Sequence, residues 1–155
     1  MYHFFLGGME LPLAPEKYTM RLTKESQVLD MADGTQMSLL RPGGLKRISF
    51  EFLLPYWGDV PMVRNGVKVH KPIYYLNRLA EWYQLAEPRR LIIYRSVPDG
   101  EECFHTDMQV SLEKYQVIEA ADLGFNVRVA VELLEYVPRN TRKYTGALAA
   151  VGGAR

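Results

Sequence analysis

The chain has 155 residues, the length of one domain, and about two-thirds of its unfolded surface can be buried on folding. Its content of 48% hydrophobic and 24% charged residues excludes a disordered or fibrous protein. The formal net charge of +1 removes the usual electrostatic argument for nucleic-acid binding, and no apolar stretch approaches the length of a membrane span. The single cysteine, Cys103, cannot form an internal disulfide, so we expect synthesis in a reducing cytoplasm without a signal peptide.

The first third of the chain predicts short antiparallel strands joined by tight turns. Its β-prone runs are separated by Gly7-Gly8, by Asp33-Gly34 and by a Pro-Gly-Gly break, which are turn signals because these residues tolerate positive φ or interrupt a strand. The expected strands cover residues 1–6, 9–13, 18–22, 27–31, 35–40 and 45–54.

One helix is predicted in the middle of the chain, over about residues 73–86. It follows residues 55–72, the longest irregular stretch, and Pro72 suits the first helical turn. Apolar residues recur at helical spacing and predict the face turned to the core. They are Ile73, Leu76, Ala80 and Tyr83. We expect Arg89 and Arg90 to favour the negative end of the helix dipole.

The last part of the chain predicts strands over residues 91–94 and 102–106, followed by a long hairpin over residues 112–136. In this hairpin, alternate side chains are predicted to share one buried face. They are Phe125, Val127, Val129, Val131 and Leu133. The order of elements predicts an α+β fold, mainly an antiparallel sheet forming a partly open barrel or a sandwich with one flanking helix.

The composition changes after residue 137. Residues 1–137 are predicted to form a β-rich domain, and residues 138–155 an extended C-terminal tail that cannot build its own core. The basic residues Arg139, Arg142 and Lys143 could dock this tail on an acidic partner, and solvated linker charge is an equally open alternative.

Three side chains are candidates for chemistry. Cys103, His105 and Asp107 occupy alternate strand positions on one face, and these residue types bind metals or form thiol–imidazole pairs. A small metal- or thiol-dependent enzyme using Cys103 and His105 is therefore one hypothesis, although ligands ~6.8 Å apart along the backbone would need help from elsewhere. The alternative is that they are ordinary strand residues. No phosphate-binding glycine motif is present, and we expect no cofactor and no enzymatic activity.

Aromatic residues exceed what a plain core requires. The aromatic residues of the helix lie on more than one of its sides, so we expect some of them to meet another strand layer or another subunit. The aromatic residues of the long loop either meet such a partner too or are buried as the loop folds back over the sheet. Together with the tail, they give the candidate partner-binding residues Tyr56, Trp57, Met62, Trp82, Arg139, Arg142, Lys143 and Tyr144.

The order of several segments resembles one known family. The segments are residues 4–15, residues 45–55, the helix followed by Leu91-Ile92-Ile93-Tyr94-Arg95, and the closing hairpin. Together they resemble the LysM-type baseplate or tail-hub proteins of contractile phage tails, phage-like elements and R-type bacteriocins. The resemblance spans about residues 1–137, and the LysM module that often follows in this family is absent here.

The resemblance implies a structural baseplate or hub component that joins the tail tube or a tube-initiator protein, the central hub or spike, and sheath or wedge subunits. It implies a homo-oligomer in a six-fold ring, made in the bacterial cytoplasm and located in a virion or phage-tail-like particle. Because exposed strand edges invite pairing, we expect the sheet to continue across subunits or the tail to lie on a neighbour. The open alternative is a tail-assembly chaperone or adaptor that is not retained in the particle.

Overall fold

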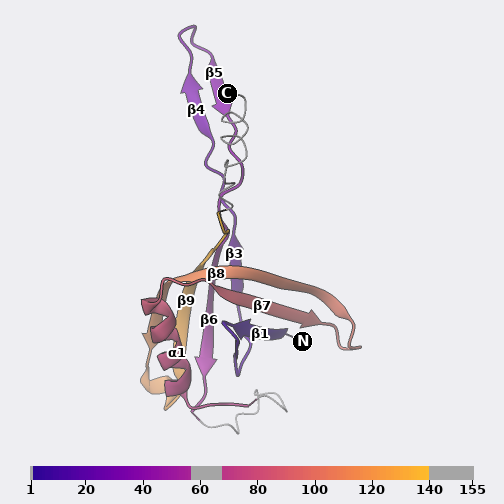
Figure 1. Cartoon of the computed structure of the whole chain (residues 1–155), viewed down its shortest axis with the longest axis vertical. Coiled ribbons are helices and arrows are strands. Elements are labelled where there is room, and N and C mark those ends of the chain that lie inside the picture. The colour runs from indigo at the N-terminus through magenta and orange to yellow at the C-terminus, as the bar shows by residue number, and fades with distance from the viewer. Residues whose placement is uncertain (1, 57–67, 140–155) are drawn as a thin grey trace, which may run out of the picture.

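The computed structural model describes residues 2–56 and 68–139, and this part is an α+β fold, as the sequence predicts (Figure 1). Its strands form a seven-stranded antiparallel sheet in the order β2-β1-β7-β8-β9-β6-β3 and a separate two-stranded arm, β4-β5. The elements are β1 (Tyr2–Leu6), β2 (Met9–Glu10), β3 (Tyr18–Arg21), β4 (Gln27–Asp30), β5 (Gln36–Leu39), β6 (Arg47–Leu54), α1 (Pro72–Gln84), β7 (Arg89–Ser96), β8 (Glu102–Ile118), the 3-10 helix η1 (Ala121–Leu123) and β9 (Val127–Glu135).

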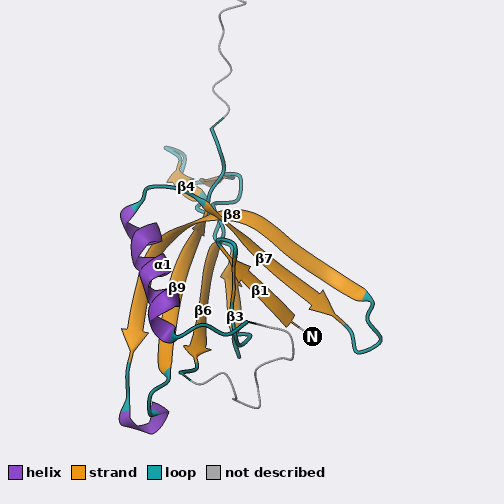
Figure 2. Cartoon of the chain, turned by 60° about the horizontal axis from the view of Figure 1, so that its bottom comes forward, coloured by secondary structure: helices purple, strands orange, loops and turns teal. Residues whose placement is uncertain are grey.

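Strand β8 joins the two halves of the sheet. Its first part pairs with β7 and its second part pairs with β9, and Val110 stands at the change, opposite Arg89 on one side and Glu135 on the other. A bulge between Leu112 and Lys114 inserts one extra residue, which bends a strand and increases its twist. The sheet therefore folds over on itself but stays open, without closing into a barrel (Figure 2).

The core lies inside this folded sheet and continues under α1. Strands β6 and β9 alternate in burial, so their inward apolar side chains pack together while the outward side chains are more exposed and mostly polar. The buried inward residues include Ile48, Phe50, Phe52, Leu54, Val129, Val131 and Leu133. The predicted alternation is thus confirmed from Val127 onward. It is wrong for Phe125, which is 75% exposed, because Gly124 with φ of 60° breaks the extended chain before β9 begins.

The helix is confirmed, with Pro72 in its first turn, but most of the predicted buried face is wrong, and of its residues Leu76 alone packs against the core, partly buried. Tyr75, Leu79 and Trp82 face the core, whereas Ile73 is 60% exposed and Tyr83 is 51% exposed. Both sets have helical spacing, and the larger side chains of the observed set fill the space above the sheet. The spacing alone could not decide between them.

The expected role of Arg89 and Arg90 at the helix end is also wrong, because both residues belong to β7. The Arg90 guanidinium instead donates two hydrogen bonds to the Asp107 carboxylate on β8, with Nε at 2.6 Å from Oδ1. The side chain of Arg89 packs against the turn at Gly7 so closely that a Cβ on Gly7 would lie 2.9 Å from Arg89 Cδ. These arginines therefore tie neighbouring strands together.

Candidate interaction surfaces

The most prominent surface is the arm formed by β4 and β5, which stands away from the rest of the domain (Figure 1). Its tip is the predicted Asp33-Gly34 turn, in which Gly34 has φ of 84°. The Asp33 carboxylate accepts hydrogen bonds from the backbone N–H of Thr35 at 2.9 Å and from its hydroxyl at 2.6 Å. These bonds hold the pKa of Asp33 below its usual range. The tip is thus fixed by its own residues.

Two strand edges that the described chain leaves unpaired, one on β3 and one on the second part of β8, are further candidate contact sites. Strand β3 pairs with β6 along one edge, and no described strand pairs with its other edge. On β8, the residues after Val110 pair with β9 alone, so within residues 2–56 and 68–139 their second edge also has no strand partner. Open edges of this kind can accept a strand from another chain.

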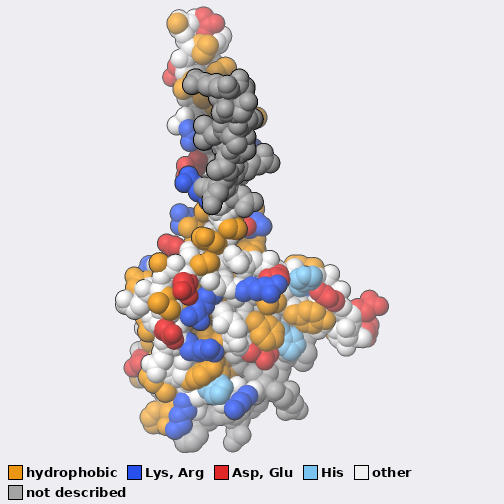
Figure 3. Space-filling view, viewed as in Figure 1, with side chains coloured by type: hydrophobic (Ala, Val, Ile, Leu, Met, Phe, Trp, Pro, Cys, Tyr) orange, Lys and Arg blue, Asp and Glu red, His pale blue; other side chains and the backbone are white. Residues whose placement is uncertain are grey.

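The outer face of the sheet next to β3 carries a groove of about 720 Å³. Its lining mixes charges of both signs, including Lys17, Glu51, Arg128 and Glu132. Acidic and basic side chains are likewise interspersed over the visible face of the body (Figure 3). A partner on this face would meet matched local charges rather than one broad field.

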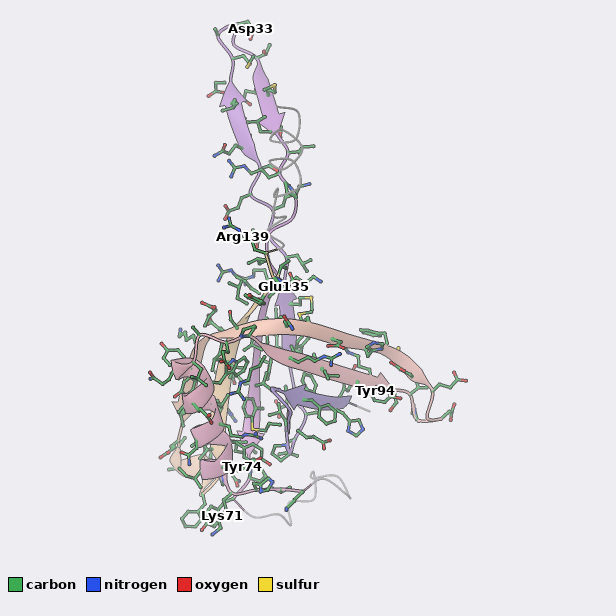
Figure 4. The ribbon with its side chains drawn as sticks, in the orientation of Figure 1. Asp33, Lys71, Tyr74, Tyr94, Glu135 and Arg139 are labelled. Carbon is green, nitrogen blue, oxygen red and sulfur yellow. The ribbon has the colours of Figure 1, made fainter. Side chains whose placement is uncertain are left out.

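Tyr56 lies beside Lys71, which Figure 4 places at the end of the domain opposite the arm. Its backbone N–H donates to Asn126 Oδ1 at 3.0 Å, and its ring lies 5.7 Å from that of Phe125. The Lys71 ammonium lies 5.9 Å from the ring centre. A shallow cavity of about 620 Å³ separates these residues from Ile73, so the two exposed apolar side chains Ile73 and Phe125 flank it. The sequence names Tyr56 as a partner-binding candidate, whereas it assigns Phe125 to the buried face of the closing hairpin.

Trp82 is not on the surface: it is 3% exposed, and its indole N–H donates to the carbonyl of Glu87 at 3.0 Å. Tyr75 is also buried, and its hydroxyl accepts the backbone N–H of His70 at 3.2 Å. Burial raises the pKa of Tyr75, while that hydrogen bond acts in the opposite direction. Tyr83 instead packs edge-on against Tyr115 of β8. Among these helix aromatics, the ring of Trp82 therefore serves the core rather than a partner.

Arg95 is a buried cation held by aromatic rings. It is 9% exposed, its guanidinium carbon lies 4.2 Å from the ring centre of Phe104, and Nη1 donates to the Thr106 hydroxyl at 2.9 Å. Tyr18 approaches from β3, with its ring centre 5.9 Å away and its hydroxyl buried without a hydrogen-bond partner among the described residues. Burial raises the pKa of Tyr18, and the charge of Arg95 opposes the shift. Stacking on the rings offsets part of the cost of burying this charge.

Cys103, His105 and Asp107 do lie on alternate positions of β8, as predicted. The Cys103 thiol is exposed, and His105 Nδ1 lies 2.6 Å from the Glu102 carboxylate. The Asp107 carboxylate accepts hydrogen bonds from the Arg90 guanidinium. Hydrogen bonding to Arg90 holds the pKa of Asp107 below its usual range. The described residues contain no group of three or more His, Cys, Asp or Glu side chains placed to hold a metal.

The tail is described only as far as Arg139, which is exposed. Figure 4 places Glu135 and Arg139 at the base of the arm. The remaining partner-binding candidates lie outside the described residues: Trp57, Met62, Arg142, Lys143 and Tyr144. No helix of the described chain is long and apolar enough to cross a membrane.

No protein-family model and no curated protein sequence matches the chain. Solved structures do match it, each at 10% sequence identity with a TM-score of 0.55. One is a chain from the sheath/tube terminator of the PVC extracellular contractile injection system in its extended state, with 88% of this chain and 89% of that chain covered. Others come from the PVC sheath–tube complex, with 88% and 84% covered, and from the six-fold symmetrised baseplate of the anti-feeding prophage, with 89% of each covered. At this identity the likeness shows a common fold.

Proposed function

We propose that this chain is a structural, non-enzymatic component of a contractile tail or contractile injection system. The observation that carries the proposal is the fold likeness to chains of such particles, which covers nearly all of both chains in each pair. A shared whole domain is stronger support than a shared motif, although folds can serve several functions. The resemblance of the sequence segments to LysM-type baseplate or tail-hub proteins supports the same class and favours the baseplate over other positions.

The open sheet edges suggest how copies would assemble. Strands β8, β9, β6 and β3 alternate in direction. A neighbouring copy whose β8 lies beside β3 would continue this antiparallel order, and the same contact repeated around an axis closes a ring. We propose a homo-oligomeric ring of this kind with six-fold symmetry, contacting a tail-tube or tube-initiator protein on its axis and hub, spike, sheath or wedge subunits around it.

Two further surfaces would contact these neighbours. Tyr56 and the adjoining Phe125 offer an aromatic contact of the type enriched at protein interfaces. The basic residues from Arg139 onward offer a docking site for an acidic partner. We therefore expect deletion of residues 139–155 to leave the domain folded and to lower its incorporation into particles. Unchanged particle yield and composition would count against a docking role for the tail.

The location of the chain tests the proposal. Particles purified from producing cells should contain it by mass spectrometry, and gold-labelled antibody should mark one end of the tail tube in electron micrographs. Absence from finished particles but presence in immature ones would instead indicate an assembly chaperone or adaptor. Normal assembly and activity of a Cys103→Ser, His105→Ala variant would eliminate the enzyme hypothesis, whereas loss of a catalytic activity would support it.

Cysteine cross-linking tests the ring contact. In a Cys103→Ser background, Thr19→Cys and Gln116→Cys place thiols on the outer face at the two open edges. Oxidation of assembled particles should then give a ladder of linked copies on a non-reducing gel. The matched control replaces Gln116→Cys by Ala130→Cys, which lies opposite it on β9 in the middle of the sheet, and should give no ladder. Equal products from both variants would contradict the proposed contact.

A further inference from the structure

The arm has one apolar face that the rest of the described chain leaves exposed. In the register of β4 and β5, Leu29 stands opposite Met37, and Gln27 stands opposite Leu39. Directly opposed residues share a face, so three of these four side chains form an apolar strip. They are 42%, 43% and 40% exposed for Leu29, Met37 and Leu39.

The other face of the arm is more polar. There Asp30 stands opposite Gln36, whose side-chain amide donates to the Asp30 carboxylate at 2.9 Å, and Val28 stands opposite Ser38. The arm is thus amphipathic in the way of a strand pair that packs one face on a core. An exposed apolar strip of this kind favours contact with another apolar surface.

Neither strand of the arm packs extensively on any other described element. Figure 1 shows the arm standing away from the body, so the body cannot cover it. An isolated two-stranded hairpin is at best marginally stable in water, and the side-chain hydrogen bonds within the arm, from Thr35 to Asp33 and from Gln36 to Asp30, lie at or next to its tip. Stable order along the arm therefore calls for an occupant from outside the described residues.

The chain's own C-terminal segment starts where this occupant would have to start. The backbone N–H of Glu135 donates to the carbonyl of Lys46 at 2.9 Å, and the Lys46 N–H donates to the Glu135 carboxylate at 3.1 Å. Lys46 directly precedes β6, at the end of the segment that returns from β5 of the arm. The chain continues from Glu135 to Arg139 at the arm's base (Figure 4). The segment after Arg139 is therefore tethered beside the arm.

The lengths also match. A fully extended chain spans at most roughly 3.3 Å per residue, so the nine steps from Lys46 to Met37 and the nine from Glu135 to Tyr144 have the same maximum reach of about 30 Å. The residues after Tyr144 can therefore reach the strip. They are Gly146-Ala147-Leu148-Ala149-Ala150-Val151, a run without charge in which small side chains allow close approach and Leu148 and Val151 supply apolar bulk.

We propose that residues 146–151 dock on the apolar face of the arm of the same chain and cover Leu29, Met37 and Leu39. The arm is then a composite of two distant parts of the sequence. The basic residues between Arg139 and Lys143 remain near its base. This proposal does not rest on the proposed function, because it concerns a contact within one chain and is tested on the purified protein.

Cross-linking of the full chain tests the contact. In the Cys103→Ser background, Leu148→Cys is combined either with Met37→Cys on the apolar face or with Ser38→Cys, its neighbour on the other face. A tethered but undocked tail meets both positions at similar effective concentration, so equal oxidation rates would overturn the proposal. Docking predicts an intrachain disulfide that forms about tenfold faster with Met37→Cys. Disulfide-linked dimers would show that a second copy occupies the strip and would overturn the same-chain contact.

Hydrogen exchange gives a second readout without cysteines. Replacing the apolar bulk by Leu148→Ser with Val151→Ser should speed amide exchange over residues 27–39 and leave β6 and β9 unchanged. The matched control, Ala147→Ser with Ala149→Ser, keeps both larger side chains and should exchange like the unmodified chain. Exchange in the arm that is identical in all three proteins would overturn the proposal.

Discussion

The contact between α1 and the sheet gives a sharp prediction, because two leucine-sized residues on one helix have opposite environments. Leu79 is 1% exposed, whereas Ile73 is 60% exposed. Replacing each by alanine removes a similar volume from the same helix. We expect Leu79→Ala to destabilise the protein strongly and Ile73→Ala to have almost no effect.

The size of the effect follows from the packing around Leu79. A residual cavity of only about 10 Å³ lies beside it, lined by residues that include Leu6, Met9 and Trp82, so the helix and the first hairpin already fit closely. Truncation of a buried leucine costs about 2–5 kcal/mol, with the larger values where the surroundings cannot collapse. An exposed substitution usually stays within about 0.5 kcal/mol.

Urea unfolding followed by tryptophan fluorescence measures both variants. With a slope of about 2 kcal/mol/M, Leu79→Ala should lower the midpoint by about 1–2.5 M, and Ile73→Ala by at most about 0.3 M. An equal loss in the two variants, or a larger loss for Ile73→Ala, would refute the packing of Leu79 against the sheet. It would restore the face that the spacing of Ile73, Leu76, Ala80 and Tyr83 predicts.

Two further predictions concern single contacts. Gly7 and Gly8 both have positive φ, and a Cβ at Gly7 would also lie 2.9 Å from Arg89 Cδ, whereas a Cβ at Gly8 would meet nothing within 4 Å. We expect Gly8→Ala to cost about 1–2 kcal/mol of backbone strain and Gly7→Ala to cost more. Equal urea midpoints for the two variants would contradict this. Because Arg90 lowers the folded-state pKa of Asp107, their pairing stabilises the fold above the usual carboxyl pKa of about 3.9 and is lost as the pH falls through the lowered value. The unmodified protein should therefore exceed Asp107→Asn in urea midpoint at neutral pH and converge with it in acid, and a difference that grows in acid would contradict the pairing.

Local sequence patterns were sufficient for much of the fold. The Asp33-Gly34 hairpin and the alternation in β6 and β9 are confirmed because turn chemistry and a period of two are properties of adjacent residues. The single helix is confirmed for the same reason, since Pro72 and the helical period are local signals.

The errors arise where distant parts of the chain decide. Which face of α1 is buried depends on where the folded sheet leaves room. Trp82 is therefore buried, although tryptophan as a residue type is common at protein interfaces. The sequence predicts two separate strands where β8 is one strand that serves both halves of the sheet. His105 and Asp107 share a face as predicted, but the pairing of Asp107 with Arg90 depends on the register with β7, which spacing does not contain. His105 instead meets Glu102, three residues earlier on the same strand.

The most direct test of the structural role is a cryo-electron microscopy map of the purified particle at a resolution that separates strands. The account predicts repeated copies of this domain around the axis at one end of the tail tube, with β3 of each copy beside residues 111–118 of the next. A map of the complete particle that contains no density for this domain, or that holds its copies apart with both sheet edges uncovered, would contradict it.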